Sequence, residues 1–287
     1  MAAAITSPLS VARPPLPYGR RLHLPGRGTT FIREVQGPRN APTILLLHGW
    51  CASAGLNWRH EFEPLARHFN VIAPDLRGHA RGLRTRKIFR LADCADDCAA
   101  TLEQLGTGPV IVAGYSMGGP ISQLLWRRHR DLVDGMVLSA TTMGFMPKRV
   151  VRRAYQAWMF GAAAGARALS VTPLLPGLPA LNMATKSMPA WAAAEVRRHD
   201  WRMIVEAGQS ISTYYAGRWI GEVDVPTSVV VTEADHGVPA DLQLATAEAI
   251  PGATVHRVDE GHLACAKESF AEPFVGACLD VLSRVNR

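Results

Sequence analysis

The chain has 287 residues, which is enough for one large α/β domain or two modest ones. Hydrophobic residues make up 48% and charged residues 19% of it, as is usual for a globular protein with a sizeable core. The net charge of +7 comes mostly from arginines, in two loose clusters without a nucleic-acid motif or interleaved aromatic residues. We therefore expect no nucleic-acid partner and interpret the charge as a solvated basic surface, with attraction to anionic substrates or lipid surfaces as the alternative.

The N-terminal region carries no sign of export or membrane insertion. Ala, Pro and Ser dominate its start, which predicts a flexible arm over residues 1–20. It lacks a charged segment followed by a continuous apolar stretch, and no window of the chain reaches the roughly 18 apolar residues of a membrane-spanning helix. The five cysteines are odd in number and lack disulfide-framework spacing. The resulting prediction is a cytoplasmic protein with no integral membrane segment.

Apolar runs of strand length alternate along the chain with stretches of helical periodicity. Buried strands are predicted at residues 43–47, 70–74, 109–113, 135–138, 228–231 and 253–258, with an antiparallel edge strand at 29–35. Helices are predicted at residues 91–105, 120–130, 242–250 and 270–285. This alternation predicts an α/β fold with a mostly parallel, doubly wound sheet.

Cys94 and Cys98 fall on one predicted helix, but no neighbouring ligands complete a four-ligand set, so no metal site is expected.

Residues 141–222 break the alternation. They contain no convincing strand and are rich in Ala, Met and Trp, with helical stretches near 148–169, 188–199 and 200–218. The simplest interpretation is a helical cap inserted between two core strands, which leaves residues 21–140 and 223–287 as the core. The cap composition favours a moderately hydrophobic substrate, although such residues more often serve packing.

The chemistry centres on Ser116, which lies in Gly114-Tyr-Ser-Met-Gly118 between a predicted buried strand and a predicted helix. A serine on such a strand-to-helix turn is held in a strained conformation with its hydroxyl exposed, and Gly114 and Gly118 avoid clashes across the turn. The N-terminus of the following helix favours developing negative charge. We therefore predict that Ser116 is a nucleophile, the alternative being an ordinary glycine-rich turn.

A serine nucleophile needs a base, and on this type of turn the chain order is serine, acid, histidine. Several histidines follow Ser116: His129, His199, His236, His256 and His262. Of these, His262 follows a predicted strand at its carboxyl end, the edge where α/β sheets place their chemistry. We therefore predict that His262 is the base.

The acid is expected just beyond another strand. Asp235 follows the strand predicted at 228–231 and is our choice, while Glu233 is close enough to compete. Asp224 precedes that strand and would lie at the opposite edge. The predicted oxyanion donors are the backbone N–H of Met117, next to the nucleophile, and that of Trp50, in the loop after the strand at 43–47.

These segments resemble the ordered motifs of the α/β-hydrolase superfamily, in particular its lidded serine hydrolases: esterases, lactonases, carbon–carbon bond hydrolases and cofactor-free haloperoxidases. The motifs, in order, are Leu47-His-Gly-Trp50, Ala73-Pro-Asp-Leu-Arg-Gly-His79, Gly114-Tyr-Ser-Met-Gly-Gly119, Asp235-x-x-Val-Pro239 and Gly261-His262. The resemblance implies a Ser116–Asp235–His262 triad under a helical cap, with Asp75, Arg77 and His79 in structural roles. The chain departs from the family at Ala80 and at Thr232, where glycine is common.

The leading hypothesis for function is hydrolysis of a carboxylic ester or lactone of a small substrate through an acyl-enzyme, without a metal or organic cofactor. Carbon–carbon bond hydrolysis, lyase activity or perhydrolysis on the same triad is the first alternative. A non-catalytic ligand-binding member of the fold is the second. The sequence predicts neither the oligomeric state nor the residues that select the substrate.

Overall fold

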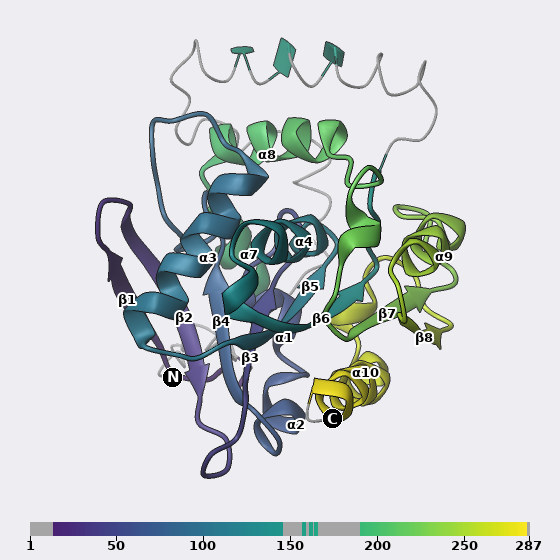
Figure 1. Cartoon of the computed structure of the whole chain (residues 1–287). Coiled ribbons are helices and arrows are strands. Elements are labelled where there is room, and N and C mark those ends of the chain that lie inside the picture. Colours follow the sequence, from purple (N-terminus) through teal and green to yellow (C-terminus); the bar gives the residue numbers. More distant parts are fainter. Residues whose placement is uncertain (1–13, 146–156, 159–160, 163, 166–189, 286–287) are drawn as a thin grey trace, which may run out of the picture.

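The computed structural model describes residues 14–145, 157–158, 161–162, 164–165 and 190–285. Its centre is an eight-stranded sheet in the order β1-β2-β4-β3-β5-β6-β7-β8 (Figure 1). The strands are β1 (Gly19–Leu24), β2 (Gly28–Val35), β3 (Thr43–Leu47), β4 (Asn70–Asp75), β5 (Val110–Tyr115), β6 (Val133–Ser139), β7 (Thr227–Thr232) and β8 (Thr254–Val258). Strand β2 is antiparallel to both of its neighbours, and every pair from β4 to β8 is parallel. The predicted fold class is therefore confirmed.

Helices cover both faces of the sheet. The α-helices are α1 (Ala54–Trp58), α2 (Phe62–Ala66), α3 (Leu91–Leu105), α4 (Gly118–Arg128), α7 (Ala190–Arg197), α8 (Trp201–Thr213), α9 (Ala240–Ala249) and α10 (Ala271–Val285). Four short 3-10 helices are η1 (Arg130–Leu132), η2 (Ile220–Glu222), η3 (Ala264–Ala266) and η4 (Glu268–Phe270). One core layer contains side chains of α3, α4 and α9, and the opposite layer contains those of α1, α2 and α10.

The central strands are apolar on both faces because each face meets one of these layers. In β3, Leu45 and Leu47 belong to the layer of α3 and α4, whereas Ile44 and Leu46 belong to the layer of α1 and α10. Successive side chains of a strand point to opposite faces, so a strand between two helix layers needs apolar residues at every position. This is the physical reason why the continuous apolar runs predicted these strands.

The N-terminal edge of the sheet differs from the prediction. The strand predicted at 29–35 is β2 and is antiparallel, but it is not the edge, because β1 pairs with its outer side. In β1 only Leu22 and Leu24 are buried, so its sequence gives little strand signal. Residues 19–20 of the predicted arm belong to β1, and residues 1–13 of that arm lie outside the described residues.

The insertion between β6 and β7 carries α7 and α8, as expected for helices inserted between two core strands. Helix α8 packs against α3 and lies above α3 and α4 in Figure 1. The two inserted helices are separate because Asp200 begins a new helix: its side chain accepts a hydrogen bond from the Met203 N–H. Most of the helix predicted at 148–169 lies outside the described residues, and the cap boundaries at 141 and 222 remain predictions.

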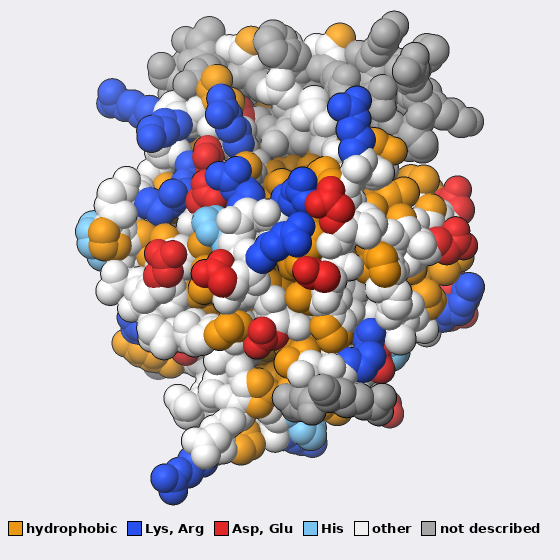
Figure 2. All heavy atoms as spheres, viewed as in Figure 1, with side chains coloured by type: hydrophobic (Ala, Val, Ile, Leu, Met, Phe, Trp, Pro, Cys, Tyr) orange, Lys and Arg blue, Asp and Glu red, His pale blue; other side chains and the backbone are white. Residues whose placement is uncertain are grey.

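On the face shown in Figure 2, basic side chains lie among acidic ones. Within the described ranges, no helix is long and apolar enough to cross a membrane. All five cysteines are free thiols, and Cys94 and Cys98 are buried in α3.

Candidate active site

Ser116 lies on a sharp turn between β5 and α4. Its φ of 49° is in the left-handed region, which a side-chain-bearing residue rarely adopts. The turn is tight: a Cβ on Gly114 would come within 2.3 Å of the Gly118 carbonyl oxygen, and one on Gly118 within 2.1 Å of the Leu47 oxygen. The two glycines therefore permit the close approach that brings Ser116 to the carboxyl edge of the sheet.

The structure brings Ser116, His262 and Asp235 together although they are far apart in sequence. Ser116 Oγ lies 2.9 Å from His262 Nε2, and His262 Nδ1 lies 2.8 Å from Asp235 Oδ2. Because a carboxylate only accepts hydrogen bonds, Nδ1 carries the proton and Nε2 is free to accept one from the serine hydroxyl. This is the geometry that a serine nucleophile and its base require.

Asp235 is held as a carboxylate by an array of donors. Its Oδ1 accepts the N–H groups of Gly237 and Val238, each at 2.8 Å. Thr232 Oγ1 donates to Oδ2 at 2.9 Å, while Gln243 Nε2 donates to that hydroxyl. Burial alone would raise the pKa of Asp235, but the hydrogen bonds from His262, Val238 and Thr232 hold it below its ordinary value. Asp235 is therefore ionised at neutral pH.

The competing acids lie elsewhere. Glu233 forms an exposed ion pair with Arg257 at 2.7 Å. Asp224, as expected for a residue before β7, is remote from this edge and accepts a hydrogen bond from Trp126 Nε1 at 3.0 Å. Neither carboxylate hydrogen-bonds His262.

Three of the other four candidate histidines are engaged away from Ser116. His129 follows α4 and contacts Asp96 at 2.9 Å. His256 lies in β8, 3.7 Å from Asp280. His199 belongs to the insertion and contacts the main chain of two core loops.

The loop after β3 runs beside Ser116. A Cβ on Gly49 would lie 3.4 Å from Ser116 Cβ, and the Gly49 N–H donates to Asn57 Oδ1 at 2.9 Å. Among the described residues, the N–H groups of Trp50 and Met117 have no hydrogen-bond acceptor. Neither N–H is therefore committed to another acceptor there, and the oxyanion role of both residues stays a prediction.

Sequence reasoning missed three residues that orient this site. The Tyr115 hydroxyl donates to the His262 carbonyl at 2.9 Å and ties the histidine loop to the turn at Ser116. Thr141 Oγ1 donates to the Ser116 carbonyl at 2.7 Å. Asn57 orients Gly49 from α1. Only Tyr115 carried a signal, since it lies inside the glycine-flanked motif.

The segment after β4 braces the neighbouring loops. Asp75 accepts the N–H of Ala54 at 2.9 Å and that of Arg81 at 3.1 Å. Arg77 forms a two-pronged ion pair with Asp97 at 2.7 and 2.8 Å. His79 is fully buried and its Nδ1 contacts the Arg77 carbonyl at 2.9 Å. These contacts agree with the structural roles that the resemblance implies.

Residues 42–269 match the family described as alpha/beta hydrolase fold. Because the match spans most of the chain, the protein belongs to this family. The resemblance drawn from the five motifs is thereby confirmed.

Two curated relatives and one solved structure illustrate the similarity. The magnesium-chelatase 30 kDa subunit of Rhodobacter capsulatus is 29% identical over 270 residues, which cover 86% of this chain and 88% of that protein. The bifunctional esterase/perhydrolase DCH of Acinetobacter calcoaceticus is 33% identical over 123 residues, 42% of this chain and 44% of that protein. A thermophilic esterase from Thermogutta terrifontis superposes with a TM-score of 0.73 at 20% identity, over 93% of this chain and all of that one. At this identity, the structural likeness shows the fold alone.

Proposed function

We propose that the protein is a serine hydrolase that cleaves a carboxylic ester or lactone of a small substrate through an acyl-enzyme. The observation that carries the proposal is the hydrogen-bonded chain from Ser116 through His262 to an ionised Asp235. A lone serine hydroxyl is a weak nucleophile, and this chain supplies both the base that removes its proton and the anion that stabilises the charged base.

In the first half-reaction, Ser116 Oγ attacks the carbonyl carbon as His262 Nε2 takes its proton. The substrate carbonyl oxygen becomes an oxyanion, which accepts hydrogen bonds from the N–H groups of Trp50 and Met117. His262 then protonates the leaving oxygen as the carbon–oxygen bond breaks. In the second half-reaction, water gives a proton to His262 and attacks the acyl carbon. As the bond from that carbon to Ser116 Oγ breaks, His262 returns the proton to Oγ, which restores Ser116 and releases the acid.

The test combines a covalent probe with a substrate series. A fluorophosphonate is expected to label wild-type protein and to leave Ser116→Ala unlabelled. p-Nitrophenyl esters of increasing acyl length, together with a lactone panel, would then define the substrate class. Full ester hydrolysis by Ser116→Ala would disprove the assignment.

A second candidate function is association with a magnesium chelatase. The observation that favours it is the similarity over nearly the whole length to a protein named as a subunit of that enzyme. Co-purification of a tagged chain with a magnesium chelatase would support it, and retention of the complex by Ser116→Ala would separate this role from hydrolysis.

A further inference from the structure

Two loops next to the candidate site contain residues in the left-handed backbone region without being glycine. Cys51, which follows Trp50, has a φ of 58°, and Ala80, in the loop after β4, has a φ of 39°. Such conformations persist only where the surrounding structure holds them, and they concentrate at functional sites. The contacts that hold these two residues therefore bear on the function of the site.

Cys51 is part of the turn that presents the Trp50 amide. The Ala52 N–H donates to the Gly49 carbonyl at 3.3 Å, which closes a turn with Trp50 and Cys51 at its centre. A positive φ at the third residue of a turn normally calls for glycine. Relaxation of Cys51 would reorient the turn, and with it the direction of the Trp50 N–H.

One side chain of the insertion holds both strained loops. The Ala80 N–H donates to His199 Nδ1 at 2.8 Å, so Nδ1 is unprotonated and the proton of the neutral ring lies on Nε2. His199 Nε2 lies 3.1 Å from the Cys51 carbonyl oxygen and donates to it. Burial lowers the pKa of His199 to about 4, so the ring is neutral at pH 7 and can make both contacts at once.

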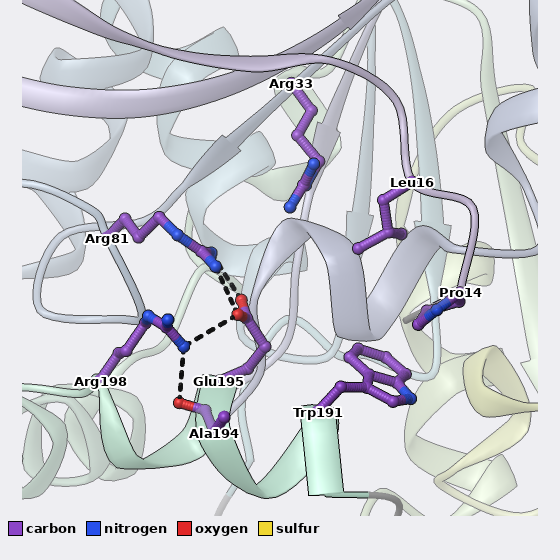
Figure 3. Close-up of a pocket in the computed structure, with 8 residues that line it drawn as sticks. All are labelled: Pro14, Leu16, Arg33, Arg81, Trp191, Ala194, Glu195 and Arg198. Atoms are coloured by element: carbon purple, nitrogen blue, oxygen red, sulfur yellow. Dashed lines mark hydrogen bonds and ion pairs between the residues drawn. The ribbon is translucent and has the colours of Figure 1, made fainter. Parts of the chain in front are cut away.

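The backbone around His199 is itself attached to the core on both sides. On the α7 side, Arg81 Nη1 donates to Glu195 Oε2 at 2.6 Å, and Figure 3 shows dashed lines from both Arg81 and Arg198 to the Glu195 carboxylate. On the α8 side, the Asp200 N–H donates to the Gly78 carbonyl at 2.8 Å. Helix α8 also accepts a hydrogen bond from the Trp50 indole, whose Nε1 lies 2.9 Å from the Ile204 carbonyl oxygen.

We propose that His199 is a positioning residue that keeps the Trp50 amide directed at the oxygen bound next to Ser116, so that the insertion completes the oxyanion hole. The inference rests on the proposed function, because it concerns the donor that the acyl-transfer step requires. It adds to that function the statement that stabilisation of the transition state depends on the inserted helices.

Two amide variants of different length separate the two contacts of the imidazole. The amide nitrogen of His199→Gln reaches the place of Nε2 and can still donate to the Cys51 carbonyl. The shorter His199→Asn retains an acceptor for the Ala80 N–H but cannot reach Cys51. Each variant would be assayed for kcat and KM on a p-nitrophenyl ester, for inhibition by a trifluoromethyl ketone that forms the tetrahedral adduct, and for thermal unfolding.

We expect kcat to fall most in the variant that loses the contact with the Cys51 carbonyl. Because one oxyanion donor contributes about 10²- to 10³-fold to kcat, a misdirected donor in His199→Asn should lower kcat about 10- to 100-fold. KM should change less than about 3-fold, and the inhibition constant of the ketone should rise in step with the fall in kcat. His199→Gln should retain at least about a third of the wild-type kcat.

Several outcomes would overturn the inference. Equal losses in both variants, or a change in KM at constant kcat, would show that the histidine supports folding or substrate binding instead. Trp50→Phe provides a second variant that does not threaten the core, because the Trp50 side chain is partly exposed. It removes the indole bond to Ile204 and keeps the backbone amide, so kcat should fall about 3- to 10-fold; an unchanged kcat would count against the proposal.

Fluorophosphonate labelling distinguishes failure of this inference from failure of the proposed function. If wild-type Ser116 is not labelled, the proposed function fails and the positioning role falls with it. If wild-type Ser116 is labelled and folded His199→Asn is labelled at the same rate, the hydrolase assignment stands and only the role of His199 is rejected.

Discussion

The turns that carry Ser116 and Asp235 and the inserted helices are held in place by two different kinds of contact. Asp235 is oriented by groups within three residues of it in sequence, the amides of Gly237 and Val238 and the hydroxyl of Thr232. Helices α7 and α8 are attached through residues more than 100 positions away, as in the contact between Glu195 and Arg81. The geometry of a local backbone motif is determined by a short stretch of sequence, whereas long-range contacts form only when the chain has folded.

The largest expected effect tests the local half of this contrast. Ser116→Ala should lower kcat by at least about 10⁴-fold on an ester that the wild type hydrolyses, because no other group on the turn can form the acyl-enzyme. Steady-state assays would measure this, with the exposed Ser283→Ala as the matched control. Substantial residual ester hydrolysis by Ser116→Ala, in a preparation free of contaminating esterases, would show that Ser116 is not the nucleophile.

The next effect concerns the acid. Asp235→Asn keeps the shape of the side chain but no longer stabilises the protonated His262 ring or fixes its tautomer, so kcat should fall about 10³- to 10⁴-fold. Glu233→Gln is the control, since its carboxylate pairs with exposed Arg257, and it should remain within about 3-fold of wild type. A larger loss in Glu233→Gln than in Asp235→Asn would reverse the assignment of the acid.

A third prediction concerns a carboxyl group buried in the core. Burial raises the pKa of Glu61 from its ordinary 4.5 to about 8. Above pH 4.5 the unfolded chain releases this proton while the folded protein retains it, so stability should fall as the pH rises toward 8. Glu61→Gln cannot ionise and should gain about 3 to 4 kcal/mol relative to wild type between pH 5 and pH 8.

Urea unfolding at the two pH values would measure this difference. Glu63→Gln is the matched control two residues away, because the side chain of Glu63 is exposed and pairs with Arg67 at the surface. A pH dependence in Glu61→Gln equal to that of wild type would show that Glu61 titrates normally in the folded protein.

The smallest expected effect tests the long-range half of the contrast. Glu195→Gln removes the charge that pairs with Arg81, which should loosen α7 from the core without touching Ser116. We expect kcat/KM to fall about 3- to 10-fold and limited proteolysis within residues 141–222 to become faster. Glu248→Gln, at an exposed residue of α9, is the control and should change neither kcat/KM nor the rate of proteolysis. Faster proteolysis with unchanged kcat/KM would show that the attachment of α7 does not matter for turnover.

The same contrast explains how much the sequence could predict. The central strands and the turn at Ser116 were predictable because a strand buried on both faces must be apolar throughout and a tight turn must carry glycine. Strand β1 was not, because it buries only Leu22 and Leu24. Thr232 was visible only as a departure from the family, yet its hydroxyl contacts Asp235. His199 could be discarded as a base but could not be placed, since its contacts join the insertion to two core loops that are more than 100 positions away in sequence.

The shared contacts of His199 and Trp50 limit how such an insertion can be exchanged. A chimera that received residues 190–213 from a relative without a histidine at position 199 would lose the donor to Cys51. It would keep the acceptor of the Trp50 indole, a main-chain carbonyl, only where the new helix kept the position of α8. Glycine at position 51 would adopt the positive φ at little cost, so the recipient loop would no longer need a contact to hold that conformation. Recombination that aims to change the proposed substrate preference of this protein should therefore move the loop at 49–52 together with the inserted helices.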